Sequence, residues 1–292
     1  MREIPTFLKD MLLQQYGEDI TNKIIDGYKT RNVSFRVNNL KSKKEKIEEE
    51  LKKANIKYKN VNWYNDAFII ENVREDEIKN LSIYENGEIY LQSLSSMLPP
   101  LFLDLKKDEN ILDMAAAPGG KTTEMASISN DEVFITACEK NKIRADRLKY
   151  NLDKQGVKSV NIMYEDSRKL SDFFSFDKIL LDAPCSGSGT NNVFSEKFTR
   201  ELIERSVKTQ EQLINKAIKI LKPGGTLIYS TCSILMQENE KIIENITKRN
   251  LAKVTPLKLD DEIPTLPTRV NGTICVCPNE QFEGFYLAKL TK

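Results

Sequence analysis

From residue 109 onward, short apolar runs alternate with longer segments whose apolar residues recur at helical spacing, as Ile203, Val207, Ile214 and Leu221 do. Residues 179–181 (Ile-Leu-Leu) are apolar throughout, which is typical of strands covered by helices on both faces. The pattern predicts strands at 110–113, 132–138, 159–163, 178–182 and 225–230, and helices at 120–128, 141–154 and 199–221. This alternation predicts an α/β protein with a doubly wound sheet.

The first 85 residues follow a different pattern. It predicts helices at 7–15 and 18–28, a strand at 33–37, a charged amphipathic helix at 41–54 and short strands at 61–64 and 67–70. Glu85-Asn86-Gly87 interrupts this pattern. We therefore predict a small N-terminal α+β domain over residues 1–85 and a larger domain over 86–292, whose last segments, Thr273–Val276 and Phe285–Leu290, form a closing hairpin.

Charge and composition exclude several classes of protein. Forty-four basic and 43 acidic residues give a net charge of +1, so no overall field attracts nucleic acid or a membrane. Residues 1–60 carry 14 Lys and Arg against 9 Asp and Glu, which indicates either a phosphate-facing surface or a solvated helix face. The start has no signal peptide and no apolar run approaches the ~20 residues of a membrane helix, so we expect a cytoplasmic protein.

The chain has five cysteines and no histidine. The odd number and wide spacing of the cysteines favour reduced thiols over disulfides. Cys275-Val-Cys277 lacks zinc-ligand spacing, and we interpret Cys138, Cys275 and Cys277 as small buried apolar residues, with no metal site expected. Acid–base or nucleophilic chemistry here must use Cys, Asp, Glu, Lys, Tyr or Ser.

Chemically active residues follow the predicted strands, where ligands bind in such sheets. A turn of small residues, Ala115–Lys121, follows Asp113 and opens a helix, so its backbone N–H groups can approach a ligand closely. Glu139 stands 19 residues after Gly120, a spacing that suits a ribose contact, and Asp166 suits an adenine amino group. Capping of the following helices is the alternative reading of both carboxylates.

Two classes of nucleoside ligand fit this edge of the sheet. Residues 115–122 differ from a P-loop only in having Ala115 for the first glycine, and Asp182 after an apolar strand resembles a magnesium-holding aspartate. S-adenosylmethionine also has ribose and adenine but needs no phosphate nest. Cys185 and Cys232 each follow a strand in a Ser-rich or Gly-rich turn, and NTP hydrolysis has no use for them. The thiols therefore favour a methyltransferase over an NTPase or a non-catalytic RNA-binding protein.

Three motifs resemble the Sun/Fmu-type RNA cytosine-C5 methyltransferases: Ala-Ala-Pro-Gly-Gly-Lys-Thr at 116–122 after Asp113, Asp-Ala-Pro-Cys-Ser-Gly at 182–187, and Ser-Thr-Cys-Ser at 230–233. Further support comes from residues 36–41, 92–99, 238–240 and 284–290, so the resemblance covers nearly the whole chain. It implies a class I, Rossmann-like methyltransferase sheet over 86–292 and an RNA-binding domain over 1–85. Longer members carry a further RNA-binding module, so this chain resembles a compact member.

The resemblance also implies roles for single residues. Cys232 would be the nucleophile that adds to cytosine C6, Cys185 would assist loss of the C5 proton and release of the product, and Asp182 would face both cofactor and cytosine. Glu139 would bind the ribose and Asp166 the adenine of S-adenosylmethionine. The methionine part would lie on Ala115, Ala116, Ala117, Pro118, Gly119, Gly120 and Lys121.

We add hypotheses on activation and on RNA. In the absence of histidine, Lys121 and the helix N-terminus would raise the thiolate fraction of Cys232. Asp182, kept protonated or sharing a proton, would donate to cytosine N3 and stabilise the adduct. Ribosomal RNA is the first expected target and transfer RNA the second, and an accessory protein is a further source of specificity. We expect the RNA grip at Arg31, Arg36 and Lys41–Lys46. Phe194 and Phe198 either contact RNA or, as we favour, pack inside the protein.

Overall fold

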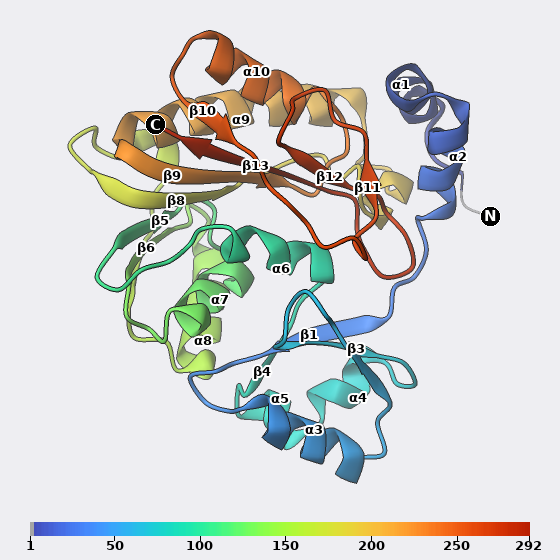
Figure 1. The fold of residues 1–292 in the computed structure, drawn as a ribbon, viewed down its shortest axis with the longest axis vertical. Coiled ribbons are helices and arrows are strands. Elements are labelled where there is room, and N and C mark those ends of the chain that lie inside the picture. The colour runs from blue at the N-terminus through green and yellow to red at the C-terminus, as the bar shows by residue number, and fades with distance from the viewer. Residues whose placement is uncertain (1–2) are drawn as a thin grey trace. The chain divides into compact units, whose positions relative to one another are not determined.

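The computed structural model describes residues 3–292 and divides into two compact units (Figure 1). Residues 32–166 form the first, which we call the central unit. The described residues up to Arg31, together with Ser167–Lys292, form the second, which we call the terminal unit.

The N-terminal part of the central unit is a four-stranded antiparallel sheet in the order β2 (Tyr58–Asn60), β3 (Ala67–Ile70), β1 (Val33–Val37), β4 (Ile89–Leu91). The helices α3 (Lys44–Lys53), α4 (Glu75–Lys79) and α5 (Ser82–Glu85) cover one face of it. Ile47 and Leu51, four residues apart on α3, pack with Phe35 and Phe68 in one buried cluster. This part therefore has a hydrophobic core of its own.

The remainder of the central unit holds three parallel strands in the order β5 (Asn110–Asp113), β6 (Phe134–Cys138), β7 (Val160–Met163). Three helices accompany them: α6 (Leu94–Leu101), α7 (Gly120–Ile128) and α8 (Lys142–Gln155). The register pairs Asp113 with Ala137 and Cys138 with Met163, so the carboxyl ends of the three strands lie side by side.

In the terminal unit, the strands β8 (Phe176–Asp182) and β9 (Leu221–Thr231) run parallel, and β13 (Phe285–Thr291) is antiparallel to β9. The short strands β10 (Lys253–Thr255) and β12 (Ile274–Val276) pair with β13, and β11 (Thr265–Leu266) pairs with β12. The helical segments are α1 (Thr6–Tyr16), α2 (Glu18–Asp26), α9 (Arg200–Ile220), α10 (Glu240–Lys248) and two 3-10 turns, Ser167–Lys169 and Asn191–Phe194.

The α/β fold class predicted from the sequence is confirmed: parallel strands alternate with helices from β5 onward, and the N-terminal part forms a small antiparallel sheet with its own helices. The closing hairpin is also confirmed by the pairing of β12 with β13. The strand predicted at 61–64 is wrong, because the strand lies at Tyr58–Asn60 and the chain turns between Val61 and Tyr64. The domain boundary near residue 86 stays a prediction.

Within residues 3–292, four α-helices were not predicted: α4, α5, α6 and α10. α6 contains Pro99 and Pro100, which lack the N–H groups that would donate to the carbonyls of Ser95 and Ser96, so the sequence argued against a helix there. In the structure Gln92 Nε2 donates to the carbonyl of Ser96 at 3.0 Å instead. α10 carries Ile242, Ile243 and Ile246 at helical spacing, a short signal among polar residues.

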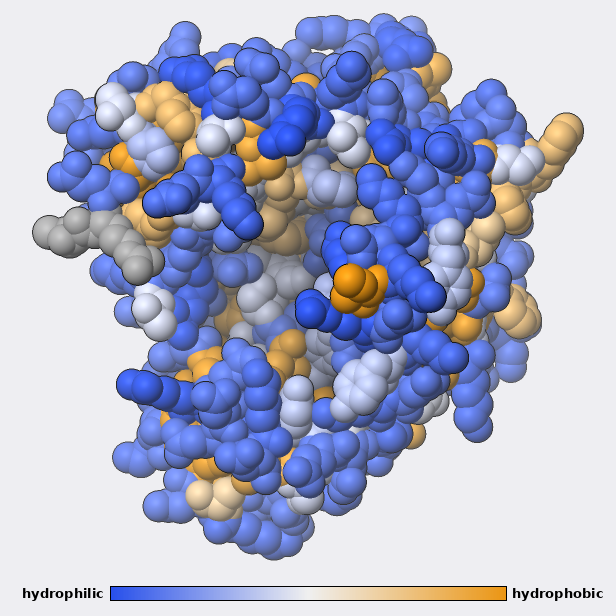
Figure 2. Space-filling view, turned by 180° about the vertical axis from the view of Figure 1, so that it is seen from behind, coloured by the Kyte–Doolittle hydropathy of each residue, from blue (hydrophilic) through white to orange (hydrophobic). Residues whose placement is uncertain are grey.

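Hydrophilic side chains cover most of the face shown in Figure 2, and apolar ones occur there in small groups. No helix within residues 3–292 is both long and apolar enough to cross a membrane.

Candidate active site

Residues Ala115–Lys121 are called the cofactor loop because the sequence predicts that they hold the cofactor. Asp113 at the end of β5 fixes this loop at both ends. Its Oδ2 accepts a hydrogen bond of 2.7 Å from Thr122 Oγ1, and its Oδ1 accepts one of 3.3 Å from the backbone N–H of Ala115. The N–H of Ala116 donates to the carbonyl of Cys138 on the neighbouring strand at 3.0 Å. The loop therefore starts from a fixed position at the carboxyl edge of the sheet.

Glycine is required at the turn into α7. Gly119 has φ of 111°, in the left-handed region, and a Cβ there would lie 3.0 Å from Leu148 Cδ1. From α8, Arg144 donates to the carbonyl of Ala117 and Asn151 donates to that of Pro118, both at 2.7 Å. The loop is thus held against α8 by its carbonyl groups.

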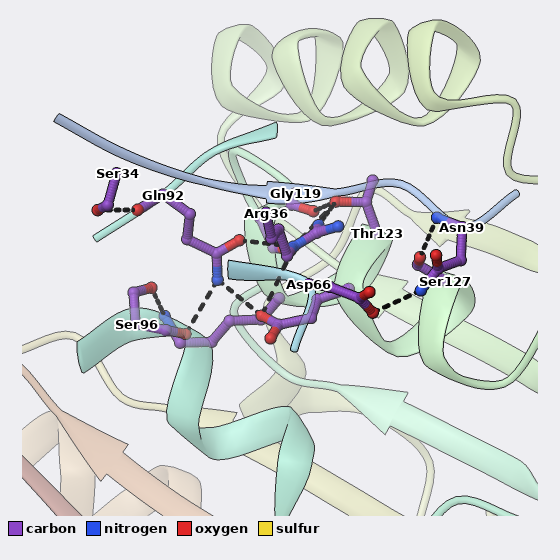
Figure 3. Close-up of polar contacts among 12 residues, drawn as sticks. Ser34, Arg36, Asn39, Asp66, Gln92, Ser96, Gly119, Thr123 and Ser127 are labelled. Atoms are coloured by element: carbon purple, nitrogen blue, oxygen red, sulfur yellow. Dashed lines mark hydrogen bonds and ion pairs between the residues drawn. The ribbon is translucent and has the colours of Figure 1, made fainter. Parts of the chain in front are cut away.

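Arg36 of β1 holds the other side of this loop (Figure 3). Its Nη2 donates to the carbonyl of Gly120 at 2.9 Å and to Thr123 Oγ1 at 2.7 Å, and its Nε donates to Gln92 Oε1 at 2.9 Å. Gln92 in turn donates to Glu124 Oε2 at 2.7 Å. Arg36 is fully buried, so its expected place in the RNA grip is wrong.

Glu124 is the acidic partner within this network. Its Oε2 lies 3.8 Å from Arg36 Nε, which makes an ion pair in which both side chains are fully buried. Burial raises the pKa of Glu124 to about 8, against the opposing effects of Arg36 and of the hydrogen bond from Gln92. Arg36 Nη1 and Glu124 Oε1 have no hydrogen-bond partner.

Glu139 and Asp166 follow the next two strands of the central unit. Glu139 is buried after β6, where its Oε1 accepts from the N–H of Asn141 at 2.8 Å and its Oε2 lies 3.4 Å from Arg144. Asp166 follows β7 and lies 3.9 Å from Lys140. The N-cap of α8 is Asn141 and not Glu139, so the capping alternative for Glu139 is wrong. Lys121 donates to Ser96 Oγ at 2.8 Å.

In the terminal unit, the two candidate cysteines meet. Cys185 follows β8 and Cys232 follows β9, and because these strands are parallel neighbours the two sulfurs lie 3.1 Å apart. The N–H of Gly189 donates to the carbonyl of Cys232 at 3.0 Å, which ties the two loops together. A Cβ on Gly189 would lie 2.1 Å from the carbonyl oxygen of Gly284, so only glycine fits there.

Glu238 connects the loop that carries Cys185 to the loop that carries Cys232, which we call the two cysteine loops. It was not predicted as a functional residue. Its carboxylate accepts from the N–H and Oγ of Ser186 at 2.8 and 2.6 Å, from Ser233 Oγ at 2.6 Å and from Gln210 at 3.2 Å. Ser186 follows Cys185 and Ser233 follows Cys232, so one fully buried carboxylate fixes both loops. Its only signal in the sequence was the short motif at 238–240.

The surroundings of the thiols distinguish them. The hydrogen bond with Cys232, together with burial, raises the pKa of the Cys185 thiol well above its usual value. Cys138, Cys275 and Cys277 are buried as expected, and burial is the main cause that raises the pKa of each. Asp182, at the end of β8, accepts a hydrogen bond of 2.7 Å from Ser230 Oγ.

The remaining candidates have structural contacts. Phe198 is buried and stacks on Phe7 at 5.8 Å, and Phe194 meets Tyr28 edge to face at 6.0 Å, as the packing interpretation predicted. Arg31 is mostly buried and lies 3.9 Å from Glu283. Within residues 3–292 no group of three or more Cys, Asp or Glu side chains is arranged to hold a metal ion.

Known proteins share the fold of this chain and resemble it in sequence over most of its length. Residues 100–291 match the family described as 16S rRNA methyltransferase RsmB/F, and residues 4–75 match the RsmF/B-like ferredoxin-like domain. The ribosomal RNA small subunit methyltransferase F of Shewanella sp. (strain ANA-3) is 34% identical over 270 residues, which cover 89% of this chain and 56% of that protein. This chain thus spans little more than half the length of that relative.

Two further proteins match over nearly their whole length. The tRNA (cytosine(49)-C(5))-methyltransferase of Pyrococcus abyssi is 35% identical over 91% of this chain and 89% of its own. The crystal structure of NSun6 from Pyrococcus horikoshii with SFG, an analogue of S-adenosylmethionine, superposes with a TM-score of 0.91 at 26% identity, covering 100% of this chain and 99% of the other. From its matched residues and its fold, this chain belongs to the RsmB/F family of S-adenosylmethionine-dependent RNA methyltransferases.

Proposed function

We propose that this chain transfers a methyl group from S-adenosylmethionine to C5 of a cytosine in RNA, through a covalent bond between Cys232 and C6. The observation that carries this proposal is the pair of thiols, Cys185 and Cys232, at the carboxyl ends of neighbouring parallel strands with 3.1 Å between their sulfurs. Five free cysteines and an RNA substrate are consistent with a reducing cytoplasm.

The residues of the central unit fit S-adenosylmethionine better than a nucleoside triphosphate. The cofactor loop has Ala115 where a P-loop has its first glycine, and Lys121 donates to Ser96. Glu139 and Asp166 offer acceptors for ribose hydroxyls and an adenine amino group but would repel phosphates. We propose that the cofactor loop and these two carboxylates hold S-adenosylmethionine. When bound, this cofactor supplies an electrophilic methyl group.

Cytosine C5 is a poor nucleophile, and this fact explains the need for a thiolate. When the Cys232 thiolate adds to C6, the electron pair moves toward N3 and C5 gains enamine character, so C5 takes the methyl group. Loss of the C5 proton then restores the C5–C6 double bond and expels the sulfur of Cys232 as thiolate. The cytosine must leave its base stack to reach the thiol.

The neighbours of Cys232 suit the proton transfers. The contact with Cys232 and burial raise the pKa of the Cys185 thiol, and we propose that Cys185 donates the hydrogen bond of this contact and so stabilises the thiolate of Cys232. We propose that Cys185 also assists loss of the C5 proton and release of the product. Ser230 donates to Asp182 Oδ1 and orients that side chain, and we propose that Asp182, holding or sharing a proton, donates it to cytosine N3. We also propose that Lys121 raises the thiolate fraction of Cys232.

Ribosomal RNA is the target we propose first, because the matched family is described as 16S rRNA methyltransferase. Transfer RNA is the second candidate, because the P. abyssi relative, matched over 89% of its length, is named for cytosine 49 of tRNA.

Transfer of a tritiated methyl group from S-adenosylmethionine to RNA from cells that lack the gene tests this function. We expect RNA labelling that the Cys232→Ser variant loses, and 5-methylcytosine mapping of the same RNA identifies the target. ATP turnover without methyl transfer would refute the proposal in favour of an NTPase.

A further inference from the structure

The central unit has a second hollow that the proposed chemistry does not use. A pocket of about 220 Å³ lies between the N-terminal sheet domain and the last turns of α8. Tyr84 and Tyr90, the cations of Lys79 and Lys154, and the amides of Asn151 and Gln155 are among its lining residues. All of these belong to residues 32–166, within a single compact unit.

A buried acceptor without a partner lies in this lining. Gln155 is 2% exposed, and its Nε2 donates to the carbonyl of Ile89 at 3.1 Å, which fixes the orientation of the amide. The other atom of the amide, Oε1, is therefore an acceptor, and it has no hydrogen-bond partner. Buried acceptors are rarely left unpaired, so this atom indicates a ligand that brings an N–H donor.

The other lining groups select the class of that ligand. The ammonium of Lys154 lies 3.6 Å from the centroid of the Tyr84 ring, and Lys79 pairs with Glu75 at 2.7 Å, so the pocket rim carries one net positive charge. Because the Lys154 ammonium lies over the face of the ring, a flat base that stacks on Tyr84 displaces it, and the displaced ammonium makes an ionic contact with the phosphate of that base. The volume lies below the ~300 Å³ typical of pockets for drug-sized ligands, which favours a single ring system.

We propose that this pocket takes one unpaired nucleobase of the substrate RNA, which stacks on Tyr84, donates to Gln155 Oε1 and has its phosphate beside Lys154. The proposal rests on the proposed RNA methyltransferase function and adds a binding site outside the reacting cytosine.

The walls of the pocket are continuous with the cofactor loop. Tyr90, opposite Arg36 in the β1–β4 pair, lies 5.1 Å from its guanidinium, and Asn151 donates to the carbonyl of Pro118. A base in the pocket thus lies within the unit that carries the cofactor loop. For this reason the test uses Tyr84 and Lys154, which have no such contact, and leaves Tyr90 and Asn151 unchanged.

The test measures KM for RNA with total RNA from cells that lack the gene. The variants are Tyr84→Leu, which removes the stacking ring without changing charge, and Lys154→Gln. Lys53→Gln serves as the matched control, because Lys53 pairs with Glu50 at 2.7 Å on α3, outside the pocket. Thermal melting identifies any variant that fails to fold, and Lys154→Gln, on the rim, keeps the test open if Tyr84→Leu unfolds.

We expect both pocket variants to raise KM for RNA at least about fivefold, with kcat and KM for S-adenosylmethionine within about twofold of the parent and no effect of Lys53→Gln. An unchanged KM for RNA in the pocket variants, or an equal effect of Lys53→Gln, would overturn the proposal that this pocket binds a nucleobase. Anisotropy of a fluorescein-labelled ten-nucleotide single-stranded RNA separates the two proposals. If the parent transfers no methyl group but binds this RNA through Tyr84 and Lys154, the function fails and the pocket stands.

Discussion

The cofactor loop and the two cysteine loops are both made of small residues, and both are held from behind by a buried charged side chain. Glu238 holds the cysteine loops, and all four of its contacts are hydrogen bonds from donors at 2.6 to 3.2 Å. Arg36 holds the cofactor loop, but its Nη1 and Glu124 Oε1, on its acidic partner, are left without partners.

The difference has a physical consequence. A buried charge with every lone pair satisfied fixes its surroundings at little cost, whereas a buried charge with partial satisfaction costs free energy and shifts its proton affinity. The pKa of Glu124, raised to about 8 by burial, expresses that cost. We therefore expect the two cysteine loops to be rigid. We expect the affinity of the cofactor loop for its cofactor to change with pH and with substitution of the residues that hold it.

The largest effect is expected at Glu238. In Glu238→Gln an amide N–H₂ replaces an acceptor, so at least one of the Ser186 or Ser233 donors loses its partner, and the two cysteine loops lose their common support. Hydrogen bonds to charged groups contribute about 1.5–3 kcal/mol, which corresponds to a loss of kcat of about 10- to 100-fold. KM for S-adenosylmethionine should stay within about twofold.

Glu240→Gln is the matched control for this prediction. Glu240 is buried two residues away, and burial raises its pKa, so Glu240→Gln removes a charge that burial disfavours. We expect its kcat to stay within about threefold of the parent. Equal losses of kcat in both variants would show that Glu238 has no particular effect on the cysteine loops.

The second effect is expected at Arg36. Arg36→Met removes the donors to Gly120 and Thr123 at the start of α7, and we expect the dissociation constant of S-adenosylmethionine to rise about tenfold or more. The double variant Arg36→Met/Glu124→Gln should recover thermal stability, since it removes the uncompensated buried carboxylate, without recovering cofactor affinity.

Ser127→Ala is the control for Arg36, because Ser127 Oγ accepts from the N–H of Asn39 at 2.9 Å and so joins the same sheet domain to the far end of α7 (Figure 3). Calorimetry without RNA measures both affinities. If Ser127→Ala weakens cofactor binding as much as Arg36→Met does, the effect comes from domain packing in general and not from support of the cofactor loop.

Counted per pH unit, the smallest effect is the pH dependence of stability due to Glu124. Its pKa is higher in the folded chain than its ordinary value of 4.5, so the folded state holds the proton more tightly and this contribution to stability is lost as pH rises from about 4.5 to about 8. The slope is at most about 1.4 kcal/mol per pH unit. Urea unfolding at several pH values should show the parent losing stability relative to Glu124→Gln in this window, and parallel curves would contradict the raised pKa.

The sequence predicted the elements whose pattern is local. The strand that contains residues 179–181 and the helix that begins at Gly120 were predicted within a few residues, because an apolar run and a glycine turn determine them directly. Cys185 and Cys232 were predicted to converge because parallel strands end at the same edge of a sheet, and the structure agrees.

The structural roles of Arg36 and Glu238 could not be predicted from the sequence. A charged residue in a strand looks exposed until the partners that bury it are known, and those of Arg36 lie 56 to 87 positions away in the chain. Glu238 gathers donors from Ser186 and Gln210, which no periodicity connects to it. Long-range polar networks of this kind depend on tertiary structure alone.

Covalent trapping tests the central claim most directly. In RNA that carries 5-fluorocytosine, the C5 substituent cannot leave as a proton, so a thiol that adds to C6 stays attached to the RNA after denaturation. Because the two sulfurs lie 3.1 Å apart, peptide mapping must identify which one is bound. We predict an adduct at Cys232 that forms in the parent and in Cys185→Ser but not in Cys232→Ser; an adduct mapped to Cys185, or one that survives in Cys232→Ser, would contradict the account.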